Sequence, residues 1–290
     1  SFFGFKPKGC WPSEGAVSAD TLKLVGQHGF KWAATGENVL RNSLSKSDMA
    51  DANIHKPYKL IEEGPACFFR DDGLSDLIGF NYTTWSAEDA VSDFINHLTT
   101  IKVETEGDKD RVVSIILDGE NAWEYYSYNG YYFLQGLYQQ LADHPELELT
   151  TFSDCLAQNV VASALPELVA GSWVYGSFST WIGDPDKNRG WDLLSQAKKT
   201  FDRVVTERTF DADTMTALLR QLAICEGSDW FWWFGDYNSG DSVSDFERLF
   251  RLHLSNLYQM LGEEVPQVLS EVVSHGGVGI EQGGTMRRGG

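Results

Sequence analysis

This 290-residue sequence contains few cysteines and no two histidines four residues apart. The four cysteines are scattered without a C-x-x-C pair; they are Cys10, Cys67, Cys155 and Cys225. A chain of this size seldom depends on a disulfide scaffold, so we expect reduced thiols and a cytoplasmic location. None of the six histidines has another histidine four residues away, so the sequence indicates no metal site, and we expect no cofactor.

Long hydrophobic runs and basic patches are also missing. No apolar run approaches the length that spans a membrane, and no signal peptide is visible at Ser1. The formal net charge is −19, whereas binding to nucleic-acid phosphates needs basic patches. An acidic chain suits a neutral partner such as a sugar, although high net charge is also a general aid to solubility. We therefore expect neither a membrane nor a nucleic acid as a partner.

Aromatic residues, in contrast, are abundant. They make up 13% of the chain and include 10 tryptophans, several of them clustered. Aromatic faces stack on the apolar faces of sugar rings, but large aromatic side chains also fill protein cores. With 42% hydrophobic and 22% charged residues, a folded core is expected, and either use is open to any one tryptophan.

Hydrophobic periodicity predicts alternating strands and helices in the first part of the chain. Strands are predicted at 30–34, 66–70, 112–117 and 148–152, and helices at 18–28, 86–104 and 129–144. This order favours parallel strands covered by helices, in a barrel or an open sheet. With the short first segment, residues 2–10, we count about five parallel strands, whereas a closed barrel has about eight. We therefore expect an open sheet or further strands upstream.

From residue 191 onward the pattern predicts helices only. They are expected at 191–205, 213–225 and 244–261, the last with Ser244 and Glu247 as a capping box. The predicted domains are the C-terminal part of a barrel over 1–190, a helical region packed on it over 191–265, and a flexible Gly-rich tail over 266–290.

The most informative carboxylate follows the predicted strand at 112–117. In the stretch Asp118-Gly119-Glu120-Asn121, Gly119 lets the chain turn sharply. Barrel enzymes place their chemistry at the C-terminal ends of parallel strands, so Asp118 is a catalytic candidate. The alternative is that Asp118 or Asn121 only caps the following turn. A metal ion at this point would need further oxygen ligands.

A second carboxylate, Glu14, lies in the stretch Trp11-Pro12-Ser13-Glu14-Gly15. Pro12 and Gly15 restrict the backbone, and Trp11 offers an aromatic wall. Two opposed carboxylates are the working parts of most glycoside hydrolases, and Glu14 beside an aromatic suits the nucleophile. The alternative is a surface glutamate at a helix N-terminus, where negative charge is favoured.

Arg70 begins a charged stretch that also contains Asp71, Asp72 and Asp76. An arginine here could hold a carboxylate in a bidentate pair and fix its ionisation. A structural Arg–Asp clamp and a substrate contact are both compatible with this pattern.

Tryptophans and aspartates recur in the second half of the chain. Trp181 and Asp184 lie in a loop-like stretch, and Asp229 and Trp230 begin the run Asp229-Trp230-Phe231-Trp232-Trp233-Phe234. Five aromatics in a row cannot all face one core, so some should border a groove or an interface. The alternative is that the run plugs the core between helices.

Together these segments resemble glycoside hydrolase family 57, the α-amylase and amylopullulanase group. Residues 11–15 resemble the third family motif, residues 116–123 the fourth and residues 173–188 the fifth. Segments 69–80 and 226–233 also recur in this family. The similarity extends over roughly residues 8 to 262, and the ordered combination is more specific than any single motif.

The resemblance implies a fold, roles and an activity. The family fold is an incomplete (β/α)7-type barrel followed by a mostly helical region. Glu14 matches the nucleophile and Asp118 the general acid/base, which in a retaining enzyme lie about 5–5.5 Å apart. The expected substrate-binding residues are Trp11, Arg70, Asp76, Glu120, Trp123, Trp181, Asp184, Asp229 and Trp230. The first two family motifs have no counterpart here, so we expect a fragment of a longer protein.

The expected function is retaining hydrolysis of α-glucan, at α-1,4 and also α-1,6 glucosidic bonds, with an oligosaccharide or polysaccharide as partner. One alternative is a glucanotransferase or branching enzyme that uses the same residues. Another is an inactive sugar-binding fragment of a longer enzyme. An α-mannosidase-like metal enzyme is a weaker rival, because the histidines lack ligand spacing. The sequence leaves linkage preference and oligomeric state open.

Overall fold

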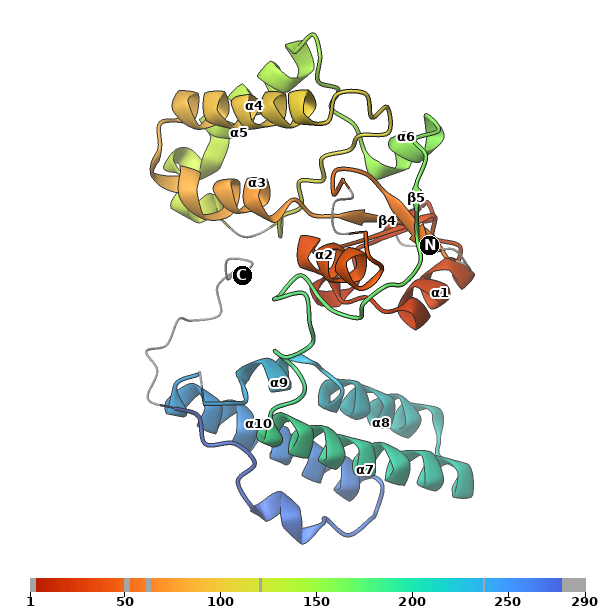
Figure 1. Ribbon diagram of the computed structural model, residues 1–290. Helices are drawn as coiled ribbons and strands as arrows, with labels where there is room; N and C mark the ends of the chain where they lie inside the picture. Colours follow the sequence, from red (N-terminus) through yellow and green to blue (C-terminus); the bar gives the residue numbers. More distant parts are fainter. Residues whose placement is uncertain (1–3, 50–52, 61–63, 120–121, 237, 278–290) are drawn as a thin grey trace. The chain divides into compact units, whose positions relative to one another are not determined.

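The computed structural model describes residues 4–49, 53–60, 64–119, 122–236 and 238–277. The chain divides into two compact units, the first ending at Phe178 and the second beginning at Ser179 (Figure 1). The domain boundaries predicted at residues 190 and 265 stay a prediction. Most of the predicted Gly-rich tail lies outside the described residues.

The first unit is built on a five-stranded sheet in the order β1-β2-β4-β3-β5. The strands are β1 (Gly9–Cys10), β2 (Trp32–Thr35), β3 (Tyr58–Leu60), β4 (Ala66–Phe69) and β5 (Ser163–Leu165). β1, β2 and β4 are parallel, β3 pairs antiparallel with β4, and β5 runs parallel to β3. The fold is therefore mixed α/β with a mostly parallel, incomplete barrel-type sheet, and the predicted fold class is confirmed.

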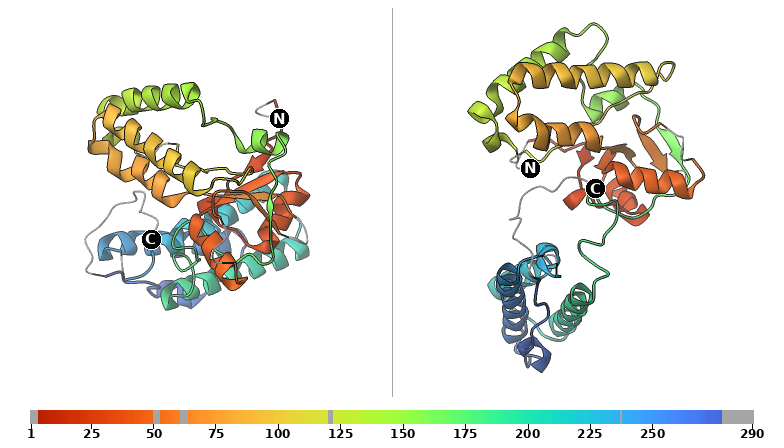
Figure 2. Two further views of the ribbon diagram at one scale, coloured as in Figure 1. Left: turned by 45° about the horizontal axis from the view of Figure 1, so that its top comes forward. Right: turned by 60° about the vertical axis from the view of Figure 1, so that its left-hand side comes forward.

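Helices flank this sheet and follow local sequence signals. They are α1 (Ala19–Gln27), α2 (Glu37–Lys46), α3 (Asp72–Asp76), α4 (Ala87–Glu104), α5 (Tyr131–Asp143) and α6 (Phe152–Ala157). Ser18 and Ser86 cap α1 and α4, because each hydroxyl accepts a hydrogen bond from the backbone N–H three residues ahead. Helices α4 and α5 lie side by side in both views of Figure 2 and share one hydrophobic cluster.

Two of the predicted strands do not form. Residues 112–117 make only an isolated bridge, from Ser114 to Arg70, because β3 already occupies that side of β4 at Cys67. The N–H of Ile116 bonds instead to the hydroxyl of Ser75. Residues 148–151 belong to no strand, and α6 begins at Phe152 with Thr151 as its cap. A strand-like pattern forms a strand only where a neighbouring edge is free to pair with it.

The second unit is helical, as predicted. It contains α7 (Pro185–Glu207), α8 (Ala212–Cys225), α9 (Asp229–Trp233), α10 (Gly240–Met260) and a 3-10 turn at Gln267–Ser270. Helix α10 packs against α7, α8 and α9. The predicted capping box is wrong, because Ser239 caps α10 and Glu247 lies inside the helix.

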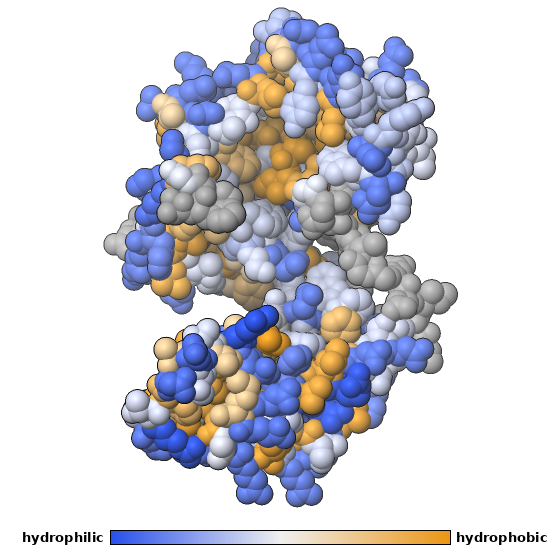
Figure 3. Space-filling model, turned by 180° about the vertical axis from the view of Figure 1, so that it is seen from behind, coloured by the Kyte–Doolittle hydropathy of each residue, from blue (hydrophilic) through white to orange (hydrophobic). Residues whose placement is uncertain are grey.

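Among the described residues of the first unit, hydrophobic side chains form three clusters. One surrounds β2 and α2, one fills the space between α4 and α5, and one joins β4 to α6. Figure 3 shows that hydrophobic side chains also reach the surface of the unit that contains α4 and α5, drawn at the top. Across the described residues, no helix combines the length and the apolar composition that crossing a bilayer needs.

Candidate active site

The C-terminal ends of the three parallel strands lie at one edge of the sheet, and each leads into acidic residues. Glu14 follows β1, Glu37 follows β2, and Asp71 and Asp72 follow β4. The parallel bridge between Arg70 and Ser114 directs the segment that carries Asp118 towards the same edge. The structure thus places both predicted catalytic residues on chain segments that leave the sheet in one direction.

The backbone of Glu14 is strained. Its φ of 55° and ψ of 25° lie in the left-handed region, which costs a residue with a side chain about 1–2 kcal/mol. The carbonyl oxygen of the following residue, Gly15, accepts a hydrogen bond of 2.5 Å from the Thr35 hydroxyl at the end of β2. Such strain persists where surrounding contacts hold it, and it is concentrated at functional sites.

Trp173 holds both the backbone and the side chain of Glu14. Its indole Nε1 donates a 3.0 Å hydrogen bond to Oε2 of Glu14, and its backbone N–H donates a 3.3 Å bond to the Glu14 carbonyl oxygen. An antiparallel bridge between Val17 and Gly171 brings these distant segments together. Gly36 permits the close approach, since a Cβ there would lie 2.5 Å from Cα of Trp173.

The remaining wall around Glu14 is aromatic. The ring of Trp11 meets the ring of Trp173 edge to face, with centroids 5.2 Å apart. On Gly15 a Cβ would lie only 2.8 Å from the Trp11 ring, so the ring packs directly on the Glu14 turn. Trp11 therefore lies where the sequence placed it, as an aromatic neighbour of Glu14.

Arg70 is buried, with 4% of its side chain exposed. Its Nη1 and Nη2 pair with Asp72 and Asp76 at 2.8 and 2.7 Å, and its Nε donates to the carbonyl oxygen of Ile116 at 2.8 Å. Its guanidinium carbon also lies 5.3 Å from the centroid of the Trp173 ring. This arrangement favours the Arg–Asp clamp over a direct substrate contact for Arg70, and it uses Asp76 in the same clamp.

The pKa values of Asp72, which belongs to the clamp, and of its neighbour Asp71 are shifted in opposite directions. Burial raises the pKa of Asp72 to about 6, against the effect of Arg70 and with added repulsion from Glu37 and Asp76. Burial also opposes ionisation of Asp71, but hydrogen bonds from His55 at 2.9 Å and from the Leu74 N–H at 2.8 Å outweigh it, so the pKa of Asp71 is lowered.

Asp118 is half-buried and lies two residues beyond the Ile116 carbonyl that Arg70 binds. Trp123 folds back towards it, since its Nε1 donates a 3.2 Å hydrogen bond to the carbonyl oxygen of Gly119. Glu120 lies outside the described residues. The expected short separation of the Glu14 and Asp118 carboxyl groups stays a prediction.

The four site residues predicted further along the chain belong to the second unit. Asp184 is the N-cap of α7, accepting hydrogen bonds from the N–H groups of Asp186 and Lys187. Trp181 is 7% exposed and packs on Trp232. Asp229 lies in the first turn of α9 and is exposed.

Trp230, the fourth of these, packs against Phe250 and His253. The other rings of this run also contact aromatic rings of the same unit, and Phe231 and Phe234 are fully buried. These contacts favour the core plug that the sequence left open. The substrate-binding roles of the four residues stay predictions.

Three site residues escaped prediction. Trp173 was noted only within a motif, Glu37 accepts the N–H of Asp72 at 3.0 Å, and His55 pairs with Asp71. The signal for Glu37 is its place after a strand end, and the signal for Trp173 is its place in the segment that resembles the fifth family motif. Trp173 is 159 residues from Glu14, and no local pattern indicates that contact.

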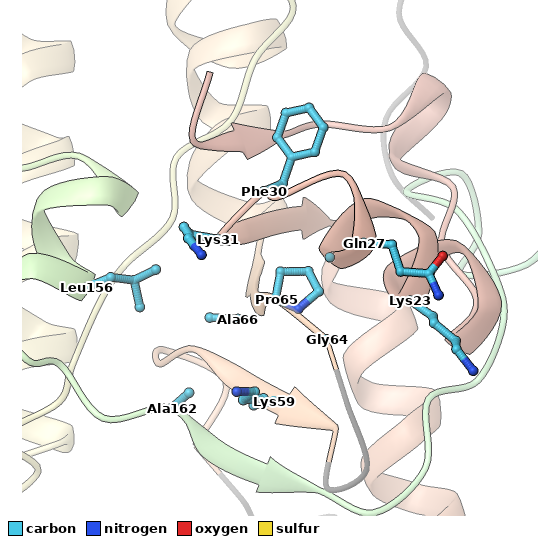
Figure 4. A pocket seen from close by; sticks show the side chains of 11 residues that line it. Lys23, Gln27, Phe30, Lys31, Lys59, Gly64, Pro65, Ala66, Leu156 and Ala162 are labelled. Atoms are coloured by element: carbon cyan, nitrogen blue, oxygen red, sulfur yellow. The ribbon is translucent and has the colours of Figure 1, made fainter. Parts of the chain in front are cut away.

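A cavity of about 660 Å³ lies elsewhere in the first unit (Figure 4). Its lining includes Lys31 and Ala66, which stand at the beginnings of β2 and β4 and therefore at the opposite edge from Glu14. Within the described ranges, no three His, Cys, Asp or Glu side chains group so that they could hold a metal ion.

Solved structures share this fold at low sequence identity. A family 57 branching enzyme from Thermococcus kodakaraensis is 15% identical with a TM-score of 0.64, and the match covers 89% of this chain and 59% of that chain. The α-amylase AmyC from Thermotoga maritima is 16% identical with a TM-score of 0.64, over 92% of this chain and 62% of that chain. A 4-α-glucanotransferase from Thermococcus litoralis is 18% identical with a TM-score of 0.54, over 89% and 43%.

This chain thus spans between 43% and 62% of the length of these three proteins. No curated protein matches it. The family model of glycosyl hydrolase family 57 matches residues 1–165, which is more than half of the chain and includes Glu14, Arg70 and Asp118. The family resemblance of the sequence is confirmed, and the chain belongs to glycosyl hydrolase family 57.

Proposed function

We propose that this protein is a retaining glycosidase that acts on α-glucan, with Glu14 as nucleophile and Asp118 as general acid/base. The observation that carries the proposal is the Glu14 turn. The backbone of Glu14 is strained where the chain leaves a parallel strand, and the indole N–H of Trp173 donates to its carboxylate at 3.0 Å, beside the wall formed by Trp11. Asp118 follows a segment that runs parallel to β4 and leaves the sheet at the same edge.

The proposed reaction has two steps. The Glu14 carboxylate attacks the anomeric carbon while the glycosidic bond breaks, and Asp118 gives its proton to the leaving oxygen. A water molecule then attacks the same carbon, transfers a proton to Asp118 and releases Glu14 from the ester. The sugar keeps its anomeric configuration because the carbon is inverted twice. Trp123, which lies against the Gly119 carbonyl, would border the sugar.

Glycosyl transfer is the first alternative, since a sugar hydroxyl can take the place of water in the second step. The structurally similar proteins include a branching enzyme, a 4-α-glucanotransferase and an α-amylase. Products decide between these activities: hydrolysis of maltoheptaose yields new reducing ends, whereas transfer yields longer or branched chains at a constant number of reducing ends.

Binding without catalysis is the second alternative. The chain spans less than two thirds of the length of the similar structures, so it could bind glucan and leave it intact. Binding of maltoheptaose measured by calorimetry, without any product, would support this alternative.

A cytoplasmic location also belongs to the proposal. All four cysteines are free thiols, as expected in a reducing compartment.

The direct test replaces each carboxylate by its amide. Glu14→Gln should abolish turnover of maltoheptaose, and Asp118→Asn should reduce it by about 100- to 10,000-fold. On an aryl glycoside whose leaving group needs no proton, Asp118→Asn should keep much of the rate of its first step, whereas its second step stays slow because the attacking water has lost its base. Glu104→Gln and Asp143→Asn are matched controls, because both side chains are exposed at helix ends. Undiminished turnover by both Glu14→Gln and Asp118→Asn would rule out the mechanism.

A further inference from the structure

Arg70 and Trp173 connect the segments of the two proposed catalytic residues through part-buried contacts. The indole of Trp173 bonds to the Glu14 carboxylate, and the guanidinium of Arg70 lies over the same indole at 5.3 Å. The Nε of that guanidinium binds the carbonyl oxygen of Ile116, two residues before Asp118. The contacts therefore run without interruption from Glu14 to the backbone that carries Asp118.

We propose that Arg70 and Trp173 are positioning residues that fix Glu14 and the Asp118 segment relative to each other. The proposal rests on the proposed function, because it assigns a purpose to contacts between two carboxylates that are themselves proposed to be catalytic. It adds two residues that neither form nor break a bond in the reaction: Trp173 acts through the Glu14 carboxylate to which it is hydrogen-bonded, and Arg70 acts through the segment that carries Asp118.

Trp173 determines which way the Glu14 carboxylate points. An indole N–H is a donor only, so its bond to Oε2 selects one orientation of the carboxylate and favours its charged form. The backbone bond from Trp173 to the Glu14 carbonyl holds the strained turn at the same time. Loss of the indole N–H alone should therefore weaken the control of the side-chain orientation while the turn stays in place.

Arg70 acts on the other side of the site. Both backbone polar groups of Ile116 are hydrogen-bonded. Its carbonyl oxygen accepts from Nε of Arg70 at 2.8 Å, and its N–H donates to the buried Ser75 hydroxyl at 3.2 Å. This segment forms no strand, and its sheet-type contact with β4 is the single bridge at Ser114, where the Asp71 N–H donates to the Ser114 carbonyl oxygen at 2.8 Å. Beyond that bridge, the side chains of Arg70 and Ser75 supply the fixed contacts.

Lysine cannot replace Arg70 in this arrangement. The guanidinium directs three nitrogens at three different acceptors, namely Asp72, Asp76 and the Ile116 carbonyl, and lays a flat face over Trp173. A lysine ammonium keeps the charge but lacks both the planar fork and the face. Arg70→Lys thus separates the geometry of the contact from its charge.

The first test compares Trp173→Phe with Trp32→Phe on maltoheptaose. Each change removes an indole N–H bond of 3.0 Å in the same unit, but Trp32 donates to the Ser153 hydroxyl outside the site. Trp173→Phe should lower kcat by about 10- to 100-fold, which is the effect expected from the loss of one hydrogen bond to a charged group. KM should be nearly unchanged. The acid limb of its pH profile of kcat/KM should move to higher pH. Trp32→Phe should change neither.

The second test compares Arg70→Lys with Arg111→Lys, whose guanidinium binds backbone carbonyl oxygens at the end of α4. Arg70→Lys should lower kcat much more than Arg111→Lys, and the melting temperature of each variant shows whether it folds. A Trp173→Phe variant that keeps the kcat and the pH profile of Trp32→Phe would overturn the proposal, even if Arg70→Lys does not fold. If Glu14→Gln and Asp118→Asn abolish activity in that case, the proposed function stands and only the positioning role fails.

Discussion

The carboxylate of Asp72 accepts a 2.8 Å hydrogen bond from Nη1 of Arg70, yet it is harder to ionise than a carboxylate in water. Burial raises its pKa to about 6 from an ordinary value of 3.8, and repulsion from Glu37 and Asp76 adds to this effect. Its second oxygen is buried without a hydrogen-bond partner. Asp72 therefore stabilises the fold when protonated and loses that contribution when it ionises.

The first prediction concerns Asp72→Asn. Since the folded pKa lies above the unfolded one, the stabilising contribution is full below about pH 4 and is lost as the pH rises through 6. A neutral amide keeps it at all pH values, so at pH 8 the variant should unfold with a free energy higher by on the order of 2 kcal/mol. At pH 4 the difference should vanish. Thermal melting of Asp72→Asn and of the exposed control Asp143→Asn across this pH range measures it, and lower stability of Asp72→Asn at pH 8 contradicts the assignment.

The second prediction concerns a buried ion pair in the second unit. Glu247 is 2% exposed and accepts hydrogen bonds from the Arg251 guanidinium and from the Val273 N–H at 2.7 Å. Glu247→Ala leaves a largely buried cation and a buried N–H unpaired, so it should cost about 3–5 kcal/mol. Chemical denaturation measures this loss.

Helix α7 offers the matched control for that measurement. Arg203 and Glu207 also form an ion pair four residues apart, but both side chains are about half exposed. Glu207→Ala should cost less than about 1 kcal/mol. Equal losses for Glu207→Ala and Glu247→Ala would show that burial does not decide the strength of these pairs.

The third prediction separates two roles for Asp184. As the cap of α7 it accepts the Asp186 N–H at 2.8 Å, so Asp184→Ala should lower stability by about 1 kcal/mol and Asp184→Asn by much less. If Asp184 binds substrate, the Asp184→Asn variant should have a higher KM for maltoheptaose while its stability is kept. Melting temperatures and KM values of the two variants give both answers. Unchanged stability of Asp184→Ala would remove the capping role.

The fourth prediction uses the close packing of Gly36. In Gly36→Ala the new Cβ would lie 2.5 Å from Cα of Trp173, although the φ of −80° at this position suits alanine. The Trp173 backbone must therefore shift, and a displacement of about 1 Å in a catalytic arrangement costs about 100-fold in rate. Gly136→Ala is the control, since its Cβ would meet only Val91 at an ordinary 3.5 Å. Equal kcat/KM values for Gly36→Ala and Gly136→Ala would contradict the prediction.

Local signals predicted the elements that need no distant partner. Ser18 and Ser86 identified the starts of α1 and α4, and the apolar runs identified β2 and β4. The run at 112–117 has the same composition as a buried strand but forms one bridge, because β3 occupies the neighbouring side of β4. Strand propensity describes a residue, whereas pairing depends on which edge is free.

The site divides in the same way. The sequence alone determined that Glu14 and Asp118 lie in segments that resemble motifs of glycosyl hydrolase family 57, near the ends of strand-like runs. This was possible because strand ends and turns are encoded by neighbouring residues. Only the tertiary structure decided that Trp173 bonds to Glu14 and that Arg70 is a buried clamp beneath Trp173. The contacts of Trp173 with Glu14 and Arg70 join residues over 100 positions apart, and they depend on the packing of the whole unit rather than on any local pattern.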